Sequence, residues 1–473
     1  MDEYRNRTFD EIEIGERASV TRTLTATEVE ALSLLAGDVD TSHLAQAPGA
    51  IAGGVTTPGA MAEPASAPGA AAIAFIAGVL HRRLPGPGSA IVATQFAYGG
   101  RLTTGDTITA TVTVRAKHAE GRRVDFACSA ITADGDTLVE GVATIAAPER
   151  RIAYSDLATP AVVLRRNDGF ARLLQRCEGL LPVRCAVVHP CDRDSLRGAV
   201  EAAKRGLIVP IMVGPEAKIR AAATDAGIDL ADYRLEFTPH SHAAAARAVA
   251  LARGGEVDAL MKGSLHTDEL MEAAVGTAYG LRTDRRASHA FVLDIPAYPR
   301  MLIITDAAIN IAPDLAAKAD ICRNAISLAL VLGVANPKVA VLSAVETVNP
   351  KIPSTVDAAA LCKMADRGQI AGGIVDGPLA FDNAISPEAA AAKGIVSPVA
   401  GVADILVVPD IEAGNMLAKQ LTYLGGADSA GIVLGTSVPI VLTSRADSVR
   451  SRLASTAVMV LVAHARRAQQ AEA

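Results

Sequence analysis

The sequence predicts an α+β domain followed by a two-lobed α/β domain, and three observations lead to this prediction. The chain has 473 residues, which is too many for one ordinary core. Between about residues 108 and 145, apolar and polar residues alternate, as in antiparallel strands with one buried face. Beyond about residue 148, short apolar runs alternate with Ala-rich stretches, which is typical of parallel strands covered by helices on both faces.

The first domain is expected at residues 1–148. Its strands are predicted at DTITATVTV, RRVDFACSAIT and TLVEGVATIAA, and the last two are separated by the turn Asp134-Gly135-Asp136. Upstream, ATEVEALSLLAGD and AAAIAFIAGVLHRRL predict helices; the second is apolar almost all round and should be buried against the sheet. The inner face of the first strand should carry Ile108, Ala110, Val112 and Val114.

The second domain is expected at residues 161–473, after a linker at 149–160. Open α/β sheets bind ligands beyond the carboxyl ends of their strands, so the polar residues that follow each apolar run are candidates for a site. The predicted strands are RCAVVHP, LIVPIMVG, DALMKG, MLIITD, KVAVLS, GGIVDG, ADILVVPD and VPIVLTS.

Composition narrows the class of protein. A net charge of -6 and a pI near 5.9 give no general attraction to nucleic acid or to anionic membranes. No run reaches the roughly 18 apolar residues of a membrane span, and the acidic N-terminus has no apolar signal segment. The six cysteines form no CxxC pair and no metal-ligand spacing. A cytoplasmic protein without a metal site is therefore expected.

The polar residues after the apolar runs form an inventory of candidates. Taken singly, each has an ordinary interpretation, because a Ser or Asp after a strand more often caps a helix than catalyses, and a lone His is more often structural. The candidates are Lys262, His266, Thr267, Asp306, Asn310, Asp376, Asp382, Asn383, Asn415, Ser444, Arg445 and Asp447.

Over about 300 residues this part of the chain resembles the phosphate acetyltransferase/phosphate butyryltransferase family. The residues in these segments resemble the butyryl branch more than the acetyl branch. The resemblance implies a domain of the isocitrate/isopropylmalate dehydrogenase-like type. It also implies exchange of an acyl group between CoA and inorganic phosphate, with acyl-CoA, phosphate and acyl phosphate as substrates and no permanently bound cofactor. The segments that carry it are ITDAAINIAPDLAAK, NPKVAVLSAVETVNPKIPST, RGQIAGGIVDGPLAFDNAIS, VAGVADILVVPDIEAGNML and PIVLTSRADS.

The family's mechanism needs positioning and charge stabilisation rather than a covalent enzyme intermediate. Ser444 and Arg445 match its Ser-Arg pair; the guanidinium would neutralise phosphate and the developing oxyanion, and the hydroxyl would donate to the same centre. His266 and Thr267 stand at its His-Ser motif. The other candidates would bind substrate, CoA or phosphate: Lys262, Asp306, Asn310, Asp376, Asp382, Asn383 and Asn415.

The sequence departs from the acetyl branch in two places. Ser451 stands where that branch has an Asp to take the thiol proton, so Asp447 is either the substitute base or a first-turn acid of the last helix. The Arg expected after the His-Ser motif is also absent. Its replacement is either Lys262 or the run Arg282, Arg285 and Arg286, which is otherwise a solvated turn.

Asp38 and His43 form a second candidate site, since an Asp and a His five apart in a loop can converge on one water. They resemble the Asp-x-Asn-Pro-x-His motif of MaoC-like hotdog domains of (R)-specific enoyl-CoA hydratases, with Asp40 and Thr41 in place of the Asn and Pro. The resemblance implies an α+β hotdog domain. Gly69 would offer its amide to the thioester oxygen at a helix N-terminus.

Four interpretations remain open. The chain has both activities, or it is an acyltransferase whose hotdog domain serves only for dimerisation or CoA binding. A third is an NAD-dependent decarboxylating dehydrogenase, which the absence of a GxGxxG motif disfavours. A non-catalytic binding protein would leave the strand-end residues unexplained. Hotdog domains pair, so a homo-oligomer is expected.

Overall fold

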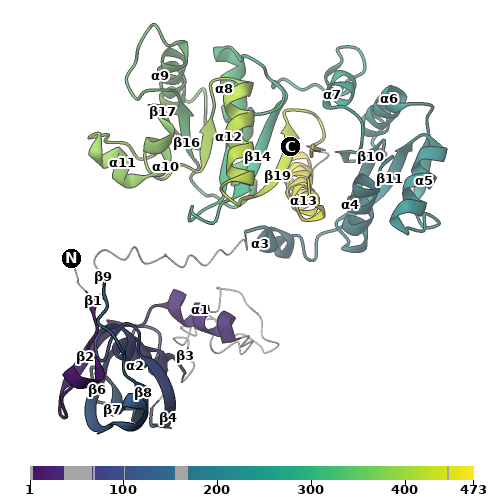
Figure 1. Ribbon diagram of the computed structural model, residues 1–473. Coiled ribbons are helices and arrows are strands. Elements are labelled where there is room, and N and C mark those ends of the chain that lie inside the picture. Colours follow the sequence, from purple (N-terminus) through teal and green to yellow (C-terminus); the bar gives the residue numbers. More distant parts are fainter. Residues whose placement is uncertain are drawn as a thin grey trace. The chain divides into compact units, whose positions relative to one another are not determined.

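The computed structural model describes residues 4–36, 66–67, 70–100, 102–154, 169–444 and 447–472. The chain divides into two compact units, Met1–Leu164 and Arg165–Ala473, called here the N-terminal and C-terminal units (Figure 1). The predicted linker at 149–160 falls partly outside the described residues and stays a prediction. No helix in the described parts of the chain combines the length and apolar character of a membrane span.

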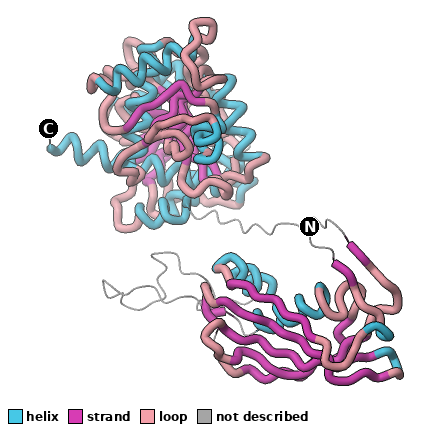
Figure 2. Tube along the Cα trace, turned by 90° about the vertical axis from the view of Figure 1, so that its left-hand side faces the viewer, coloured by secondary structure: helices cyan, strands magenta, loops and turns pink. Residues whose placement is uncertain are grey.

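In the N-terminal unit, a five-stranded antiparallel sheet packs on helix α2 (Figure 2). The predicted inner-face residues Ile108, Ala110, Val112 and Val114 are all buried, and they share a core with Ile76 of α2. The strand order is β2 (Arg17–Thr23), β6 (Thr107–His118), β7 (Arg123–Thr132), β8 (Thr137–Ala146) and β4 (Ala90–Tyr98), and α2 is Ala70–Arg82.

Shorter elements complete this unit. Strand β1 (Tyr4–Arg5) pairs with β9 (Ala153–Tyr154), and β3 (Ser66–Ala67) pairs with β5 (Leu102–Thr103). The remaining elements are helix α1 (Ala26–Ala36) and the 3-10 helices η1 (Phe9–Glu11) and η2 (Glu120–Arg122).

The C-terminal unit is built on an eleven-stranded sheet. All eight predicted apolar runs are strands of this sheet. In spatial order its strands are β12 (Arg234–Phe237), β11 (Ile208–Gly214), β10 (Val183–Val188), β13 (Ala259–Lys262), β20 (Ile440–Val441), β19 (Asp428–Leu434), β14 (Ser288–Asp294), β15 (Leu302–Thr305), β18 (Ile405–Val407), β16 (Lys338–Leu342) and β17 (Ile374–Leu379).

Two blocks of parallel strands are joined by antiparallel pairs at the centre of this sheet. Strand β14 runs antiparallel to β15 and β19, and β19 runs antiparallel to β20. The sequence did not predict β12, β14 or β19. Strand β14 begins with Ser288 and a fully buried His289, and β19 contains Gly431, so neither is a continuous apolar run.

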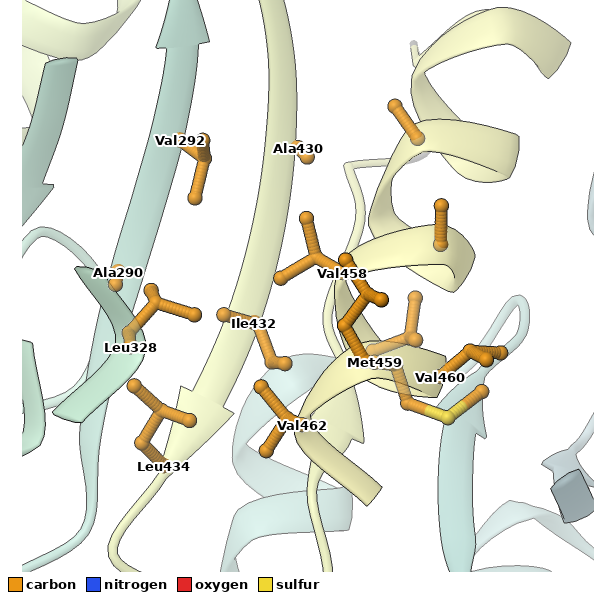
Figure 3. Packing of buried hydrophobic residues seen from close by; sticks show 14 of the residues in the cluster. Ala290, Val292, Leu328, Ala430, Ile432, Leu434, Val458, Met459, Val460 and Val462 are labelled. Carbon is orange, nitrogen blue, oxygen red and sulfur yellow. The ribbon is translucent and has the colours of Figure 1, made fainter. Parts of the chain in front are cut away.

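Helices cover both faces of the sheet, but the two faces are packed differently (Figure 2). One core runs across the whole of one face, where Val458 and Val462 of α13 lie beside Ile432 of β19 (Figure 3). The other face has two separate cores. The helices are α3 (Gly169–Arg176), α4 (Arg193–Lys204), α5 (Glu216–Ala226), α6 (Ser241–Arg253), α7 (Thr267–Val275), α8 (Leu315–Val331), α9 (Pro353–Asp366), α10 (Phe381–Ile385), α11 (Pro387–Ala392), α12 (Ile411–Tyr423) and α13 (Val449–Glu472).

Candidate functional site

A cavity of about 850 Å³ opens in the C-terminal unit between the two separate cores of the divided face. Leu265 and Leu442 of one core and Phe291 at the edge of the other line it. Five of the predicted site residues also line it: Lys262, His266, Thr267, Asn415 and Ser444. The structure therefore brings together candidates that lie up to 182 positions apart in the chain.

One wall of this cavity is made by the ends of two neighbouring parallel strands. Strand β13 ends at Lys262, and Thr443 and Ser444 follow strand β20 beside it. Lys262 is only 4% exposed and lines the cavity, and its Nζ donates to the Gly263 carbonyl over 3.4 Å. His266 and Thr267 begin helix α7 on the same wall. A cation, hydroxyls and a helix N-terminus together suit an anionic, phosphate-bearing ligand.

The loop that carries Ser444 is held by two side chains. The Ser444 amide donates to Asp447 Oδ2 over 2.7 Å, and Arg452 Nη2 donates to the Ser444 carbonyl over 3.1 Å. Arg452 is buried and also donates to Thr443 Oγ1. Sequence reasoning missed Arg452. Its only signal was a cation in the first turn of a helix, where an acid is the usual residue.

Asp447 has an electrostatic environment consistent with a role as a base. Burial raises the pKa of its carboxyl, while the Ser444 amide, Arg452 and Lys262 act in the opposite direction. A carboxylate whose pKa is raised is a stronger base than an exposed one. Ser451, at the position of the expected Asp, instead lies in the first turn of α13, where its hydroxyl is 3.2 Å from that of Ser448.

Helix α12 provides the opposite wall. Glu412, Asn415 and Lys419 lie on one face of this helix and line the cavity, and Asn415 Nδ2 donates to the Ala307 carbonyl. Sequence reasoning selected Asn415 and noted Glu412 among the residues after the same strand, without giving it a role, but it missed Lys419. The spacing of four residues from Asn415 was the signal that could have found Lys419.

Asp306 and Asn310 form a buried turn beside the cavity. The Asp306 carboxylate accepts hydrogen bonds from the amides of Ala308, Ile309 and Asn310 and from Asn310 Nδ2. Ala308 lines the cavity, whereas Asp306 and Asn310 do not. Their hydrogen bonds hold the backbone of the turn that contains Ala308, a residue of the cavity wall.

Three more candidates do not line the cavity: Asp376 lies within β17, and Asp382 and Asn383 lie in helix α10, which follows that strand. Asp376 accepts from the Gly377 amide, and Asp382 lies 3.5 Å from Lys393. Asn383 is fully buried and donates to Glu346 Oε2 over 3.3 Å. The predicted arginine run lines a second cavity, of about 490 Å³, in which Arg286 Nε donates to Asn310 Oδ1.

Four predicted site residues lie outside the described residues: Asp38, His43, Gly69 and Arg445. Their roles stay predictions.

Comparison with known proteins identifies relatives of the C-terminal unit. A sequence family described as "Phosphate acetyl/butaryl transferase" matches residues 240–460. A phosphate acetyltransferase of Rhizobium meliloti is 62% identical over 304 residues, which are 64% of this chain and 96% of that protein. A phosphate butyryltransferase of Clostridium acetobutylicum is 42% identical over 294 residues, 62% of this chain and 98% of that protein.

Two solved structures are similar to parts of this chain. A branched-chain phosphotransacylase from Enterococcus faecalis V583 matches 60% of this chain and 99% of its own, with 33% identity and a TM-score of 0.53. The R-hydratase PhaJ1 from Pseudomonas aeruginosa matches 34% of this chain and 99% of its own, with 23% identity and a TM-score of 0.31.

The first of these structures corrects one prediction. The expected isocitrate/isopropylmalate dehydrogenase-like type is wrong, because the C-terminal unit has a phosphotransacylase fold. The chemistry of the cavity fits this correction. Its polar lining is mainly ammonium, hydroxyl, imidazole and amide groups, with Glu412 as its carboxylate. Among the described residues no cluster of three or more His, Cys, Asp or Glu suits a metal ion.

Proposed function

This chain belongs to the phosphate acetyl/butyryltransferase family, and from that premise we propose that its C-terminal unit exchanges a short acyl group between CoA and inorganic phosphate. One observation carries the proposal. Lys262 and Ser444, from neighbouring strand ends, face a single cavity whose opposite wall carries Asn415 and Lys419. A cavity of about 850 Å³ has the volume of a typical small-ligand site.

The cations have separate tasks in this proposal. In the direction that forms acyl phosphate, a phosphate oxygen attacks the thioester carbonyl, the carbon–sulfur bond breaks and the CoA thiolate leaves. Lys262 neutralises the phosphate, and the Ser444 hydroxyl donates to the oxyanion that forms on the carbonyl. Arg445, which follows Ser444 in the sequence, is proposed to donate to the same phosphate. Lys419 on α12 would meet the phosphates of CoA.

In the reverse direction the CoA thiol must lose its proton before it attacks acyl phosphate. Asp447 is the proposed acceptor, because its pKa is raised by burial and it is hydrogen-bonded to the backbone of Ser444. A thiol with an ordinary pKa near 8.5 leaves only a few per cent as thiolate at pH 7, so a base that takes the proton while the sulfur attacks increases the rate.

Acetyl is the proposed acyl group. The relative that is 62% identical is named an acetyltransferase, whereas the one named a butyryltransferase is 42% identical. The higher identity to the acetyltransferase favours acetyl, whereas the sequence segments alone had suggested a preference for butyryl. A pocket discriminates one methylene by only about 1–3 kcal/mol, so activity toward propionyl and butyryl groups is expected as well.

For the N-terminal unit, two roles are proposed. One is hydration of an enoyl-CoA, which the resemblance assigns to Asp38 and His43; both lie outside the described residues. Strand β4 is an edge strand that exposes Val92 and Tyr98, which suits pairing with a second copy of the chain. Hydration of crotonyl-CoA by wild type, Asp38→Asn and His43→Ala separates the roles, since a purely structural unit gives equal signals in all three.

The acyltransferase proposal is tested by release of free thiol from acetyl-CoA with and without phosphate. We expect release only with phosphate, and a rate reduced about 100-fold or more in Ser444→Ala and Arg445→Ala. Ser437→Ala, at an exposed serine that does not line this cavity, is the matched control and should keep the wild-type rate. Thiol release that is independent of phosphate would contradict the proposal.

A further inference from the structure

Arg452 is a buried cation of α13 that has no part in the proposed function. It is 6% exposed and forms no ion pair with a carboxylate among the residues that the structure describes. Its guanidinium instead donates to the loop after β20, from Nη1 to Thr443 Oγ1 over 3.0 Å and from Nη2 to the Ser444 carbonyl over 3.1 Å. Burying a charge is costly unless an opposite charge compensates it, so this position suits an anion bound nearby.

The side chain of Arg452 is held in place by its own helix and by α4. A Cβ at Gly198 of α4 would lie 2.7 Å from Arg452 Cδ, so this close approach of the two helices needs glycine. The Arg452 amide donates to the Ser448 carbonyl, and the Arg452 carbonyl accepts from Thr456 Oγ1. The guanidinium therefore lies at a fixed position behind the loop that lines the cavity.

Thr443 connects this charge to the cavity of the C-terminal unit. It is 4% exposed and lines that cavity. A threonine hydroxyl has one proton to donate and two lone pairs that accept. One lone pair of Thr443 Oγ1 accepts from Arg452, and no acceptor among the described residues takes its proton. The proton is therefore available to a ligand in the cavity, and a hydroxyl that accepts from a cation is a stronger donor.

The neighbouring strand indicates which ligand group would accept this hydrogen bond. Strand β20 runs parallel to β13, with Val441 beside Met261, so Thr443 and Lys262 lie at adjoining strand ends. Lys262 lines the same cavity. An ammonium group together with a hydroxyl that is bonded to a guanidinium favours a doubly charged acceptor over a neutral carbonyl. Among the proposed substrates, inorganic phosphate carries such oxygens.

We propose that Thr443 is a further substrate-binding residue, which donates a hydrogen bond to an oxygen of inorganic phosphate, and that Arg452 is the residue that positions and polarises it. The inference rests on the proposed function, in which Lys262 neutralises the same phosphate. The hydrogen bond transfers no proton; it holds the attacking phosphate in place for the thioester carbonyl. Because a guanidinium stays protonated, this contribution does not change with pH, unlike that of Asp447.

The test compares Thr443→Val, which keeps the shape of the side chain without its hydroxyl, with Thr443→Ser, which keeps the hydroxyl. In thiol release from acetyl-CoA by the full chain, Thr443→Val should raise KM for phosphate at least about tenfold and leave KM for acetyl-CoA unchanged. Thr443→Ser should keep most of the affinity for phosphate. Thr436→Val is the matched control and should keep both KM values, because Thr436 is buried, donates to the Val438 carbonyl and does not line this cavity.

Two further measurements separate binding from turnover and from folding. Gly198→Ala displaces the Arg452 side chain without removing a hydrogen-bonding group, so it should raise KM for phosphate and leave KM for acetyl-CoA unchanged. Thermal unfolding with and without inorganic phosphate reports binding alone. Phosphate should raise the unfolding temperature of wild type and Thr436→Val, and it should have little effect on Thr443→Val.

Three outcomes would overturn the assignment of Thr443. These are an unchanged KM for phosphate in Thr443→Val, equal increases in KM for phosphate and acetyl-CoA, and a Thr443→Ser variant as impaired as Thr443→Val. Failure of the proposed function would give a different result. Wild type would then release no thiol with phosphate, while phosphate would still raise its unfolding temperature and not that of Thr443→Val.

Discussion

Two groups of strand-end residues in the C-terminal unit look alike in sequence and differ in where their hydrogen bonds go. Lys262 and Ser444 line the cavity, and Lys262 Nζ also donates to the Gly263 carbonyl over 3.4 Å. Asp306 and Asn310 instead bond within their own turn, where the Asp306 carboxylate accepts from the Ala308 amide and from Asn310 Nδ2. A polar residue after a strand thus has two uses, and its bonding partners decide which one applies. The first group should control rate and the second should control stability.

Loss of Lys262 should have the largest effect on rate. Lys262→Met keeps the length of the side chain and removes its charge, so we expect kcat/KM for phosphate-dependent thiol release to fall about 100-fold. Unfolding should be little changed, since Met fits a buried position. Steady-state kinetics and thermal unfolding measure both. Lys204→Met, at the exposed end of α4, is the control and should keep the wild-type kcat/KM. An equal fall in kcat/KM for Lys204→Met would show that the effect is not specific to Lys262.

Asp306→Ala should have the opposite profile, with its main effect on stability. It would leave three backbone amides and the Asn310 side chain without their acceptor in a buried turn. Each buried unsatisfied donor costs about 1–3 kcal/mol, so the free energy of unfolding should fall by about 3 kcal/mol or more. Urea denaturation measures this fall.

Asp382→Ala is the matched control for Asp306→Ala. The Asp382 side chain is 55% exposed and lies 3.5 Å from Lys393, so its loss should cost no more than about 1 kcal/mol. Similar losses in the two variants would show that the buried turn is not the source of the effect.

The same contrast explains how much of the site could be predicted from the sequence. Lys262 and Ser444 were found because each follows a continuous apolar run, and parallel strands end at one edge of a sheet. Arg452 was not found, because a buried arginine that binds a loop carbonyl leaves no periodic signal. Strands β14 and β19 were missed because Ser, His and Gly interrupt them. Asp306 was found, but the sequence alone does not show that its carboxylate faces its own backbone.

The proposed base should produce a moderate, pH-dependent effect. A raised pKa keeps Asp447 protonated to a higher pH than an ordinary Asp, so the rate of CoA attack on acetyl phosphate should fall as the pH drops through that raised pKa. In Asp447→Asn we expect this acid limb to disappear and the rate at pH 7 to fall about tenfold. The deficit should vanish near pH 9, where the thiol ionises unaided. A deficit that is constant with pH would assign Asp447 to holding the Ser444 loop.

Lys419 should give the smallest effect, on binding alone. It is exposed, it reaches the cavity from α12 and it does not share a strand end with Ser444. Removing an exposed cation from a phosphate ligand costs about 1 kcal/mol, so Lys419→Ala should raise KM for acetyl-CoA about fivefold and leave kcat unchanged. Lys393→Ala, at a lysine that pairs with Glu346 outside the cavity, should change neither constant. A fall in kcat for Lys419→Ala would place this lysine at the reacting centre, and α12 would then share the catalytic task of the opposite wall.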